Sequence, residues 1–281
     1  MPDEPSIKEL LASSSIAFTG AVEAAGRSTV GGVSPDEQTV VVRVDQPLHV
    51  PPGLRIPPGS RVTVQLSPDL PPLGPGESAT FFANGLAYGD TLAVAETGRV
   101  SVAEATAPTE PPAAEAAPVS PVQAALAELA TDEVVEHASE ADAIVRAHVV
   151  ALEQVPTEGP PREHDAQWWI ATLEVDIVVR GELPDGAGSG GKVHVLYANS
   201  LDVRWRQCPK PKAGQSGLWL LHRAPPERSN LAPFELTDPL DLQPSLQIDV
   251  LRDRGLAAPE EEAPADEEDG ESETEGGPAG A

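Results

Sequence analysis

The sequence contains very little cysteine, and this scarcity excludes two kinds of small stabilised domain. Cys208 is the only cysteine among 281 residues, so the chain can form neither an internal disulfide framework nor a zinc site built from several cysteines. Aromatic residues are also scarce, at 4%, although 40% of the residues are hydrophobic. Valine, leucine and other aliphatic side chains must therefore fill most of any packed core.

Basic residues are few as well, and their scarcity bears on the partners that the chain can have. Lysine and arginine number 18 against 45 aspartate and glutamate residues, which gives a formal net charge of −27. A charge of this sign repels phosphate backbones and anionic lipid surfaces. We therefore expect a protein partner, and neither nucleic acid nor a membrane surface.

Targeting signals are missing from the sequence. Residues 1–11 contain no basic segment followed by an uninterrupted apolar segment, which a secretory signal would require. No run approaches the roughly 18–20 apolar residues that cross a bilayer. The sequence therefore predicts a cytoplasmic protein.

Short strand-like segments dominate the first part of the chain, residues 1–103. Ser6 and Glu9 form a capping-box pattern that predicts a helix over residues 6–14. Alternating or β-branched segments then predict strands at 16–24, 39–44, 61–66, 77–83, 91–95 and 99–102. Short strands separated by turn residues are typical of a small sandwich or barrel.

Composition divides the rest of the chain into three parts. Residues 104–121 are predicted to be a linker, because 108–121 is rich in alanine, proline and glutamate without apolar periodicity. A helix is expected within 122–138, at the start of a second β-domain that covers 122–257. Residues 258–281 carry many acidic residues and no basic ones, so we expect a disordered tail.

The second β-domain repeats motifs of the first in the same order. Residues 42–45 match 173–176, 59–64 match 190–195 at the same separation, and 76–82 match 214–220 at a larger one. A fourth match joins later positions of the two domains: Leu86, Asp90, Leu92, Val100 and Val102 with Phe234, Asp238, Leu240, Ile248 and Val250. Separations that grow stepwise are what loop insertions into a duplicated domain produce. We therefore interpret the chain as one module used twice.

Each copy of the module is expected to have a short leading helix and about five strands. Glycine precedes the third strand, and a Pro/Gly turn precedes the fourth. A five-stranded Greek-key barrel of the OB type fits this pattern, whereas an immunoglobulin-like sandwich fits five strands and a helix less well. The predicted fold class is mainly β: two tandem five-stranded OB-like barrels, each with a short leading helix, plus a disordered linker and acidic tail.

Three segments of the second copy resemble the netrin- and TIMP-like OB module. They are an alternating first strand at 143–149, a second strand ending in glycine at 173–181, and a Cys-Pro loop leading to a Leu-Leu strand at 208–221. The resemblance implies an OB-type barrel and, for secreted members, a protease inhibitor with disulfides. The chain departs from this family by its single cysteine, by its lack of an export signal, and by lacking the N-terminal cysteine that usually fixes the inhibitory wedge.

Few residues fall in patterns that carry catalysis or bind a metal. The six histidines form no close metal-binding pair, so neither a metal nor another cofactor is expected, and the phase of His148 and His194 indicates a solvated strand face. Cys208 could be a nucleophile whose pKa is lowered by neighbouring basic residues. No general base or oxyanion site accompanies it. We therefore expect a non-catalytic protein in which Cys208 is an idle loop cysteine.

A cationic and aromatic segment, the basic loop at residues 204–212, is the strongest candidate for a binding surface. Tryptophan and arginine are enriched at interaction hot spots. The expected binding residues of this loop and the strand after it are Arg204, Trp205, Arg206, Cys208, Lys210, Lys212 and Trp219. The alternative interpretation is a solvated loop with Trp205 packed on the barrel.

Two further hypotheses concern the same loop. OB-type barrels can bind single-stranded nucleic acid by stacking bases on aromatic side chains, although the charge of the chain opposes this function. The acidic tail could fold back on the basic loop and compete with an anionic ligand, or it could act only as a solubilising tail. Two further tryptophans, Trp168 and Trp169, begin a predicted strand. The alternation of side chains along a strand places one ring in the core and the other outside.

Overall fold

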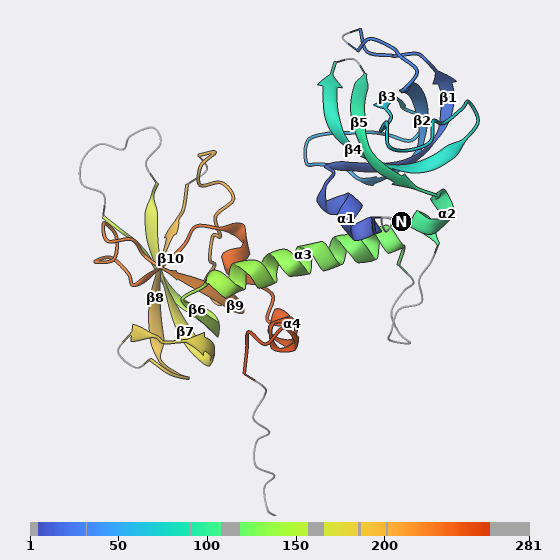
Figure 1. Cartoon of the computed structure of the whole chain (residues 1–281). Helices are drawn as coiled ribbons and strands as arrows, with labels where there is room; N and C mark the ends of the chain where they lie inside the picture. The colour runs from blue at the N-terminus through green and yellow to red at the C-terminus, as the bar shows by residue number, and fades with distance from the viewer. Residues whose placement is uncertain are drawn as a thin grey trace, which may run out of the picture. The chain divides into compact units, whose positions relative to one another are not determined.

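A computed structural model of the chain describes residues 5–31, 33–89, 91–107, 119–156, 166–184, 187–200 and 202–258. The chain divides into two compact units, Met1–Val134 and Val135–Ala281. Each unit contains a closed five-stranded barrel, and a helix precedes each barrel along the chain (Figure 1). The predicted fold class, mainly β with two such barrels, is confirmed.

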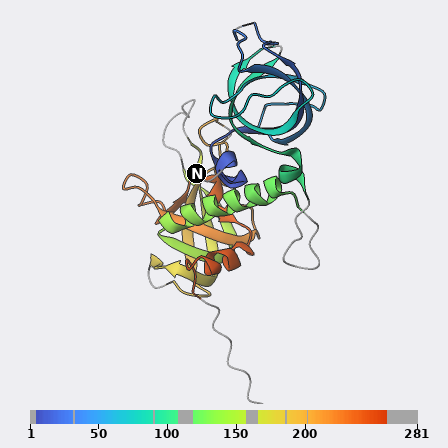
Figure 2. The same cartoon turned by 45° about the vertical axis from the view of Figure 1, so that its right-hand side comes forward.

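The first barrel is formed by strands β1 (Ile16–Ala25), β2 (Thr39–His49), β3 (Arg61–Gln65), β4 (Ser78–Tyr88) and β5 (Leu92–Val100). Their order around the barrel is β1-β2-β3-β5-β4, and β4 pairs with β1 to close the ring, which Figure 2 shows nearly end-on. The pairing of β3 with β5 is parallel and the other pairings are antiparallel. The segments predicted as separate strands at 91–95 and 99–102 therefore form one strand, β5.

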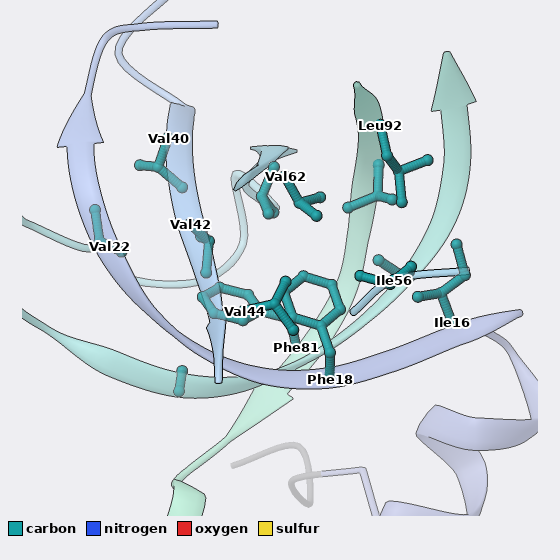
Figure 3. Close-up of a cluster of buried hydrophobic side chains, with 14 of the residues drawn as sticks. Ile16, Phe18, Val22, Val40, Val42, Val44, Ile56, Val62, Phe81 and Leu92 are labelled. Carbon is teal, nitrogen blue, oxygen red and sulfur yellow. The ribbon is translucent and has the colours of Figure 1, made fainter. Parts of the chain in front are cut away.

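The interior of the first barrel is filled by apolar side chains that alternate inward along each strand. Val22 pairs with Val42, and Val42 pairs with Val62, so three buried valines form one layer across β1, β2 and β3. The rings of Phe18 and Phe81 stack with their centroids 5.4 Å apart, and Figure 3 shows them side by side in the interior. Two of the few aromatic residues of this barrel thus lie at the centre of a core in which valine is the commonest residue.

The second barrel repeats this arrangement with β6 (Ala143–Gln154), β7 (Trp168–Gly181), β8 (Lys192–Ala198), β9 (Ser216–Arg223) and β10 (Phe234–Leu236). Strand β10 pairs in parallel with β8 and antiparallel with β9, which closes the ring. A two-residue strand, β11 (Leu242–Gln243), follows β10 and also pairs with β9. The strand order is therefore the same as in the first barrel.

The helices cover the outside of the barrels. Helix α1 (Ile7–Ala12) begins at the predicted capping box of Ser6 and Glu9. Helix α3 (Pro121–Glu140) is longer than the predicted segment 122–138; its first half packs Val122 and Ala125 with α1, and its last turn packs Ala138 on the second barrel. Helices α2 (Val102–Thr106) and α4 (Gln247–Asp253) were not expected from the sequence. No helix of the described residues combines the length and apolar character that a bilayer-spanning segment needs.

Matching hydrogen bonds confirm three of the four repeat matches. The backbone N–H of Gly59 donates to Val44 O over 2.7 Å, and Gly190 donates to Val175 O over 2.7 Å. Both glycines have a left-handed backbone, with φ of 84° and 80°. Such a φ strongly favours glycine, so the same turn precedes the third strand of each barrel.

The fourth repeat match was wrong. In the first barrel Val94 of β5 pairs with Val64, and in the second Phe234 of β10 pairs with Val195. Because Val64 and Val195 are equivalent, Val94 corresponds to Phe234, whereas the sequence match joined Phe234 to Leu86. The residues matched as a last strand, Ile248 and Val250, lie in helix α4.

The predicted domain limits meet the structure only in part. The division between the compact units falls within α3, at Val134 and Val135, because each half of this helix packs on a different unit. Most of the predicted linker, residues 108–118, lies outside the described residues. The predicted acidic tail also lies outside them from residue 259 onward.

Candidate functional site

The basic loop connects β8 to β9, and the side chain of Lys210 holds it in place. Its Nζ atom donates to the carbonyl oxygens of Ala198 at 2.7 Å, Trp205 at 3.0 Å and Cys208 at 3.4 Å. A lysine ammonium has three donors, so this one is fully used inside the loop. Lys210 therefore anchors the predicted binding surface and does not project from it.

Cys208 is a second anchor of the basic loop. Its side chain is buried, and its thiol donates to Thr237 O over 3.0 Å. Burial is the largest effect and raises the pKa of this thiol; Lys210 lowers the pKa, and the carboxylates of Asp241 and Asp238 raise it by smaller amounts. The expected lowering of the pKa by basic neighbours was wrong, because desolvation dominates. The thiol therefore stays protonated at neutral pH and packs as a structural group.

Trp219 belongs to the core and not to the surface of the loop. It is fully buried in the second barrel, and its indole N–H donates to Ala147 O over 2.9 Å. The residues next to Trp219 in β9 are all apolar and do not alternate with polar residues. Both faces of the strand are covered, the outer face by helices α3 and α4 and the inner face by the barrel. The expectation that Trp219 contributes to a binding surface is corrected on this point.

Two tryptophan side chains in contact, with an arginine at each end, form a row beside the basic loop, which we call the Trp/Arg row. The Arg204 guanidinium lies 4.8 Å from the ring centroid of Trp205. Trp205 meets Trp168 edge to face, with centroids 5.3 Å apart, and Arg228 lies 4.7 Å from the centroid of Trp168. These contacts are cation–π and aromatic pairs. Arg228 is one of the basic residues that follow the loop in the sequence, whereas Trp168 was absent from the predicted binding surface.

The exposed part of the loop is cationic and carries one apolar residue. Arg204, Arg206 and Lys212 are exposed, and Val203 is 90% exposed. Trp205 is half-buried, and its ring packs on Trp168 while its neighbours in the loop face solvent. Trp169 packs against the barrel core, as alternation predicted for one of the two rings.

Arg228 is fixed by a carboxylate from the barrel. Its Nε and Nη2 atoms donate to the two oxygens of Glu235 at 2.9 Å and 3.1 Å. Glu235 lies in β10, and Arg228 lies in the connection between β9 and β10. A two-point pair of this kind holds the plane of the guanidinium, so the outer end of the Trp/Arg row is held in a defined orientation.

A second group of side chains, the His/His/Asp cluster of His137, His222 and Asp241, lies elsewhere on the second barrel. His137 is in α3, His222 is in β9, and Asp241 ends the 3-10 helix η2 (Pro239–Asp241). The Nε2 atom of His137 is 2.7 Å from Asp241 Oδ1, and the Nε2 atom of His222 is 3.2 Å from the former and 3.3 Å from the latter. Three potential ligand atoms therefore converge.

The turn at η2 orients the buried carboxylate of this cluster. Asp241 Oδ2 accepts the backbone N–H of Thr237 at 2.7 Å and of Asp238 at 2.8 Å, while Oδ1 faces the two histidines. The hydrogen bond to Asp241 is the largest cause that raises the pKa of His222, opposed by partial burial. No metal-binding spacing is visible in the sequence, because 85 residues separate the two histidines and 104 separate His137 from Asp241.

The two remaining strand histidines behave as the sequence indicated. His148 Nδ1 is 3.2 Å from Asp176 Oδ1, and His194 Nδ1 is 3.2 Å from Thr172 Oγ1. Both lie on the outer phase of their strands, His148 half-exposed and His194 exposed. Neither belongs to a three-ligand group within the described residues.

The fold and the Trp/Arg row define the class of molecule: a protein of two tandem five-stranded barrels with one specialised loop. Comparison of the sequence with protein-family models gives no match, and comparison with curated proteins gives none either. The function of the chain is therefore inferred from the geometry of the two sites.

Proposed function

We propose that the protein is a non-catalytic binding protein that engages a protein partner through the basic loop and the Trp/Arg row of its second barrel. The observation that carries this proposal is the row itself, in which two tryptophans and two arginines lie in contact beneath exposed cationic side chains. Buried aromatic and arginine anchors surrounded by polar residues are the usual composition of an interaction hot spot.

The internal anchoring of the loop supports the same function. Lys210 and Cys208 bind carbonyl oxygens of the loop and of Thr237, so the loop is held before a partner arrives. A preorganised loop loses less conformational entropy on binding. The exposed charges of Arg204, Arg206 and Lys212 favour a partner with an acidic surface patch.

The place of the row in the barrel also supports binding. The shared strand order, with a parallel pairing of the third and fifth strands, is consistent with the OB-type barrel that the family resemblance implies. OB-type barrels bind ligands on the second and third strands and on the first and fourth connections. Trp168 begins the second strand of its barrel, and Arg228 lies in the fourth connection.

The proposal is tested by capture of partners from a lysate of the native source with matched baits. The test bait carries Arg204→Glu and Arg206→Glu, which reverse two exposed charges and remove the contact of Arg204 with the Trp205 ring. The control bait carries Arg27→Glu and Arg55→Glu, which make the same charge change at exposed positions of the first unit. We expect one protein to be recovered by the wild-type and control baits and lost by the test bait.

Two other outcomes separate this function from its alternatives. Capture that is abolished by nuclease treatment would favour single-stranded nucleic acid as the ligand, with bases stacking on the tryptophans. Equal recovery by all three baits would contradict a role for the loop. The inhibitor function implied by the family resemblance has less support, because Cys208 is the only cysteine of the sequence and cannot form the disulfides that secreted members of that family carry.

A further inference from the structure

We propose that His137, His222 and Asp241 bind one divalent transition-metal ion of the zinc class. The proposal goes beyond the binding function of the basic loop and does not depend on it. The three donors, two imidazole nitrogens and one carboxylate oxygen, are typical zinc ligands. They come from a helix, a strand and a turn of the same unit, so the folded second barrel brings them together.

The distances between the donor atoms fit a common metal ion. Ligand atoms about 2.0–2.1 Å from a tetrahedral zinc ion lie about 3.3 Å from one another. In the cluster the two Nε2 atoms are 3.2 Å apart, and His222 Nε2 is 3.3 Å from Asp241 Oδ1. Only the contact of His137 with Asp241 is shorter, at 2.7 Å. A small outward movement of one side chain would complete three corners of a tetrahedron, and a water molecule or another ligand would take the fourth.

Hydrogen bonds can join only two of the three pairs of atoms at once. A hydrogen bond from His137 Nε2 to Asp241 Oδ1 requires a proton on that nitrogen, which then cannot accept a second proton from His222. If His222 Nε2 is also protonated, both N–H groups donate to the two lone pairs of Oδ1, and the two nitrogens lie 3.2 Å apart with no hydrogen bond between them. A single cation at the point of convergence would instead be bound by the lone pairs of all three atoms.

The surroundings of the cluster have the features of a supported metal site. Asp241 is fully buried. Two backbone N–H groups donate to its Oδ2 atom, which leaves Oδ1 for the ion. Outer contacts of this kind orient metal ligands. The carboxylates of Asp142 and Glu140 also act electrostatically on His222, and negative charge near a site raises the local concentration of cations.

The first barrel shows that the fold does not need these polar groups. The strand pairings make Asn84 the counterpart of His222. Leu10 lies six residues before Ile16, and His137 lies six residues before Ala143, the residues that begin the first strand of each barrel. There Leu10 packs directly on Gly98, where a Cβ atom would lie 2.4 Å from the leucine. The second barrel replaces this apolar contact with a buried aspartate facing two histidines. A buried charge is costly unless it is paired, so the replacement indicates a function.

The test is a titration of the full chain, freed of metal by a chelator, with Zn²⁺ and separately with Co²⁺. We expect one ion to bind with micromolar or tighter affinity, and the Co²⁺ form to show the strong visible absorption of tetrahedral coordination. His222→Gln and His137→Gln should each weaken Zn²⁺ binding by about 100-fold or more, beyond the ten- to hundredfold typical of an outer contact. The Co²⁺ absorption should disappear in both variants.

The matched control is His148→Gln, which removes a histidine from a His/Asp pair that has no third ligand. This variant should bind Zn²⁺ like the wild type. The acidic surface and tail are common to all variants, so Zn²⁺ that they bind does not distinguish one variant from another. Circular dichroism and thermal melting of the metal-free variants check that they fold. The proposal would be overturned by an absence of stoichiometric Zn²⁺ binding, or by wild-type affinity in folded His137→Gln and His222→Gln. Either result would leave the cluster as a hydrogen-bonded clamp on α3.

Discussion

The two barrels of the chain share one frame and differ in what they attach to it. The layer of Val22, Val42 and Val62 in the first barrel has its counterpart in Val149, Leu173 and Val193, which pair in the same register. The connections are different. Between the third and fourth strands, the first barrel has a proline-rich segment at 66–77, whereas the second has the anchored basic loop.

The fifth strand shows the second difference. In the first barrel β5 runs for 9 residues without interruption, but in the second β10 ends after 3 residues and β11 resumes the pairing with β9. Arg99 pairs with Phe81 and Leu242 pairs with Trp219, so the turn at η2 is an insertion between two parts of one strand. This insertion brings Asp241 to the histidines. Both candidate sites therefore arise where the second barrel departs from the first.

This comparison separates residues that specify the barrel from residues that specialise it. Inward valines, the paired glycine turns and the closing strand are present in both units and account for the fold. The Trp/Arg row and the His/His/Asp cluster are present in the second unit and have no counterpart in the described part of the first. Function on a common frame is usually carried by connections in this way.

The largest expected effect tests whether the two cores are equivalent. Trp219 and Phe81 are corresponding, fully buried residues, and their replacement by alanine should each cost about 3–5 kcal/mol in unfolding free energy. All four tryptophans lie in the second unit, so tryptophan fluorescence follows that barrel during denaturant unfolding. Trp219→Ala should shift the fluorescence transition, and Phe81→Ala should shift only the circular dichroism of the first barrel.

The outcome that contradicts this prediction is also informative. An equal shift of the fluorescence midpoint by Phe81→Ala would show that the two units unfold as one cooperative structure. Trp219→Phe provides the control, because it keeps a large ring and loses only the indole hydrogen bond to Ala147. It should cost less than the alanine variant.

Most of the barrel frame was predictable from the sequence, for a definite reason. Apolar residues recur with a period of two in strands that have one face inward, and this period located β1, β2 and β3. Glycines with a left-handed backbone mark turns that depend on few other residues. The sequence failed where polar residues lie inside a strand. Thr97 and Gly98 broke the pattern of β5, although both belong to it.

The sites were less predictable than the frame. The basic loop was found because charge and tryptophan are rare elsewhere, but its internal organisation depends on carbonyl positions that no side-chain pattern records. Lys210 is an example: it was expected to face a partner and instead binds three carbonyl oxygens. The His/His/Asp cluster was missed because its residues meet only after the barrel closes and α3 packs on it.

A smaller effect distinguishes the anchored loop from its counterpart in the first barrel. Lys210→Met keeps the length of the side chain but removes the ammonium group from three carbonyl oxygens, and it should destabilise the second unit by about 1–2 kcal/mol, after allowance for partial exposure. The matched variant Pro72→Ala, at the corresponding exposed position of the first barrel, should change stability by no more than about 0.5 kcal/mol. Hydrogen exchange should become faster at 202–212 in Lys210→Met alone. Unchanged protection there would contradict the anchoring role.

The smallest expected effect is a difference between matched substitutions in the two barrels, which tests the equivalence of the frame itself. Gly76 and Gly214 precede the fourth strands with φ of 92° and 74°, and their N–H groups donate to Val22 O and Val149 O at 2.8 Å and 2.9 Å. An added Cβ would meet no atom within 4 Å at either position, so alanine introduces backbone strain without a clash. Each substitution should therefore cost about 1–2 kcal/mol. Denaturant unfolding of Gly76→Ala and Gly214→Ala should give values within about 0.5 kcal/mol of each other. A clearly larger cost in the second barrel would mean that its turn also supports the basic loop, and the two frames would then not be equivalent at this point.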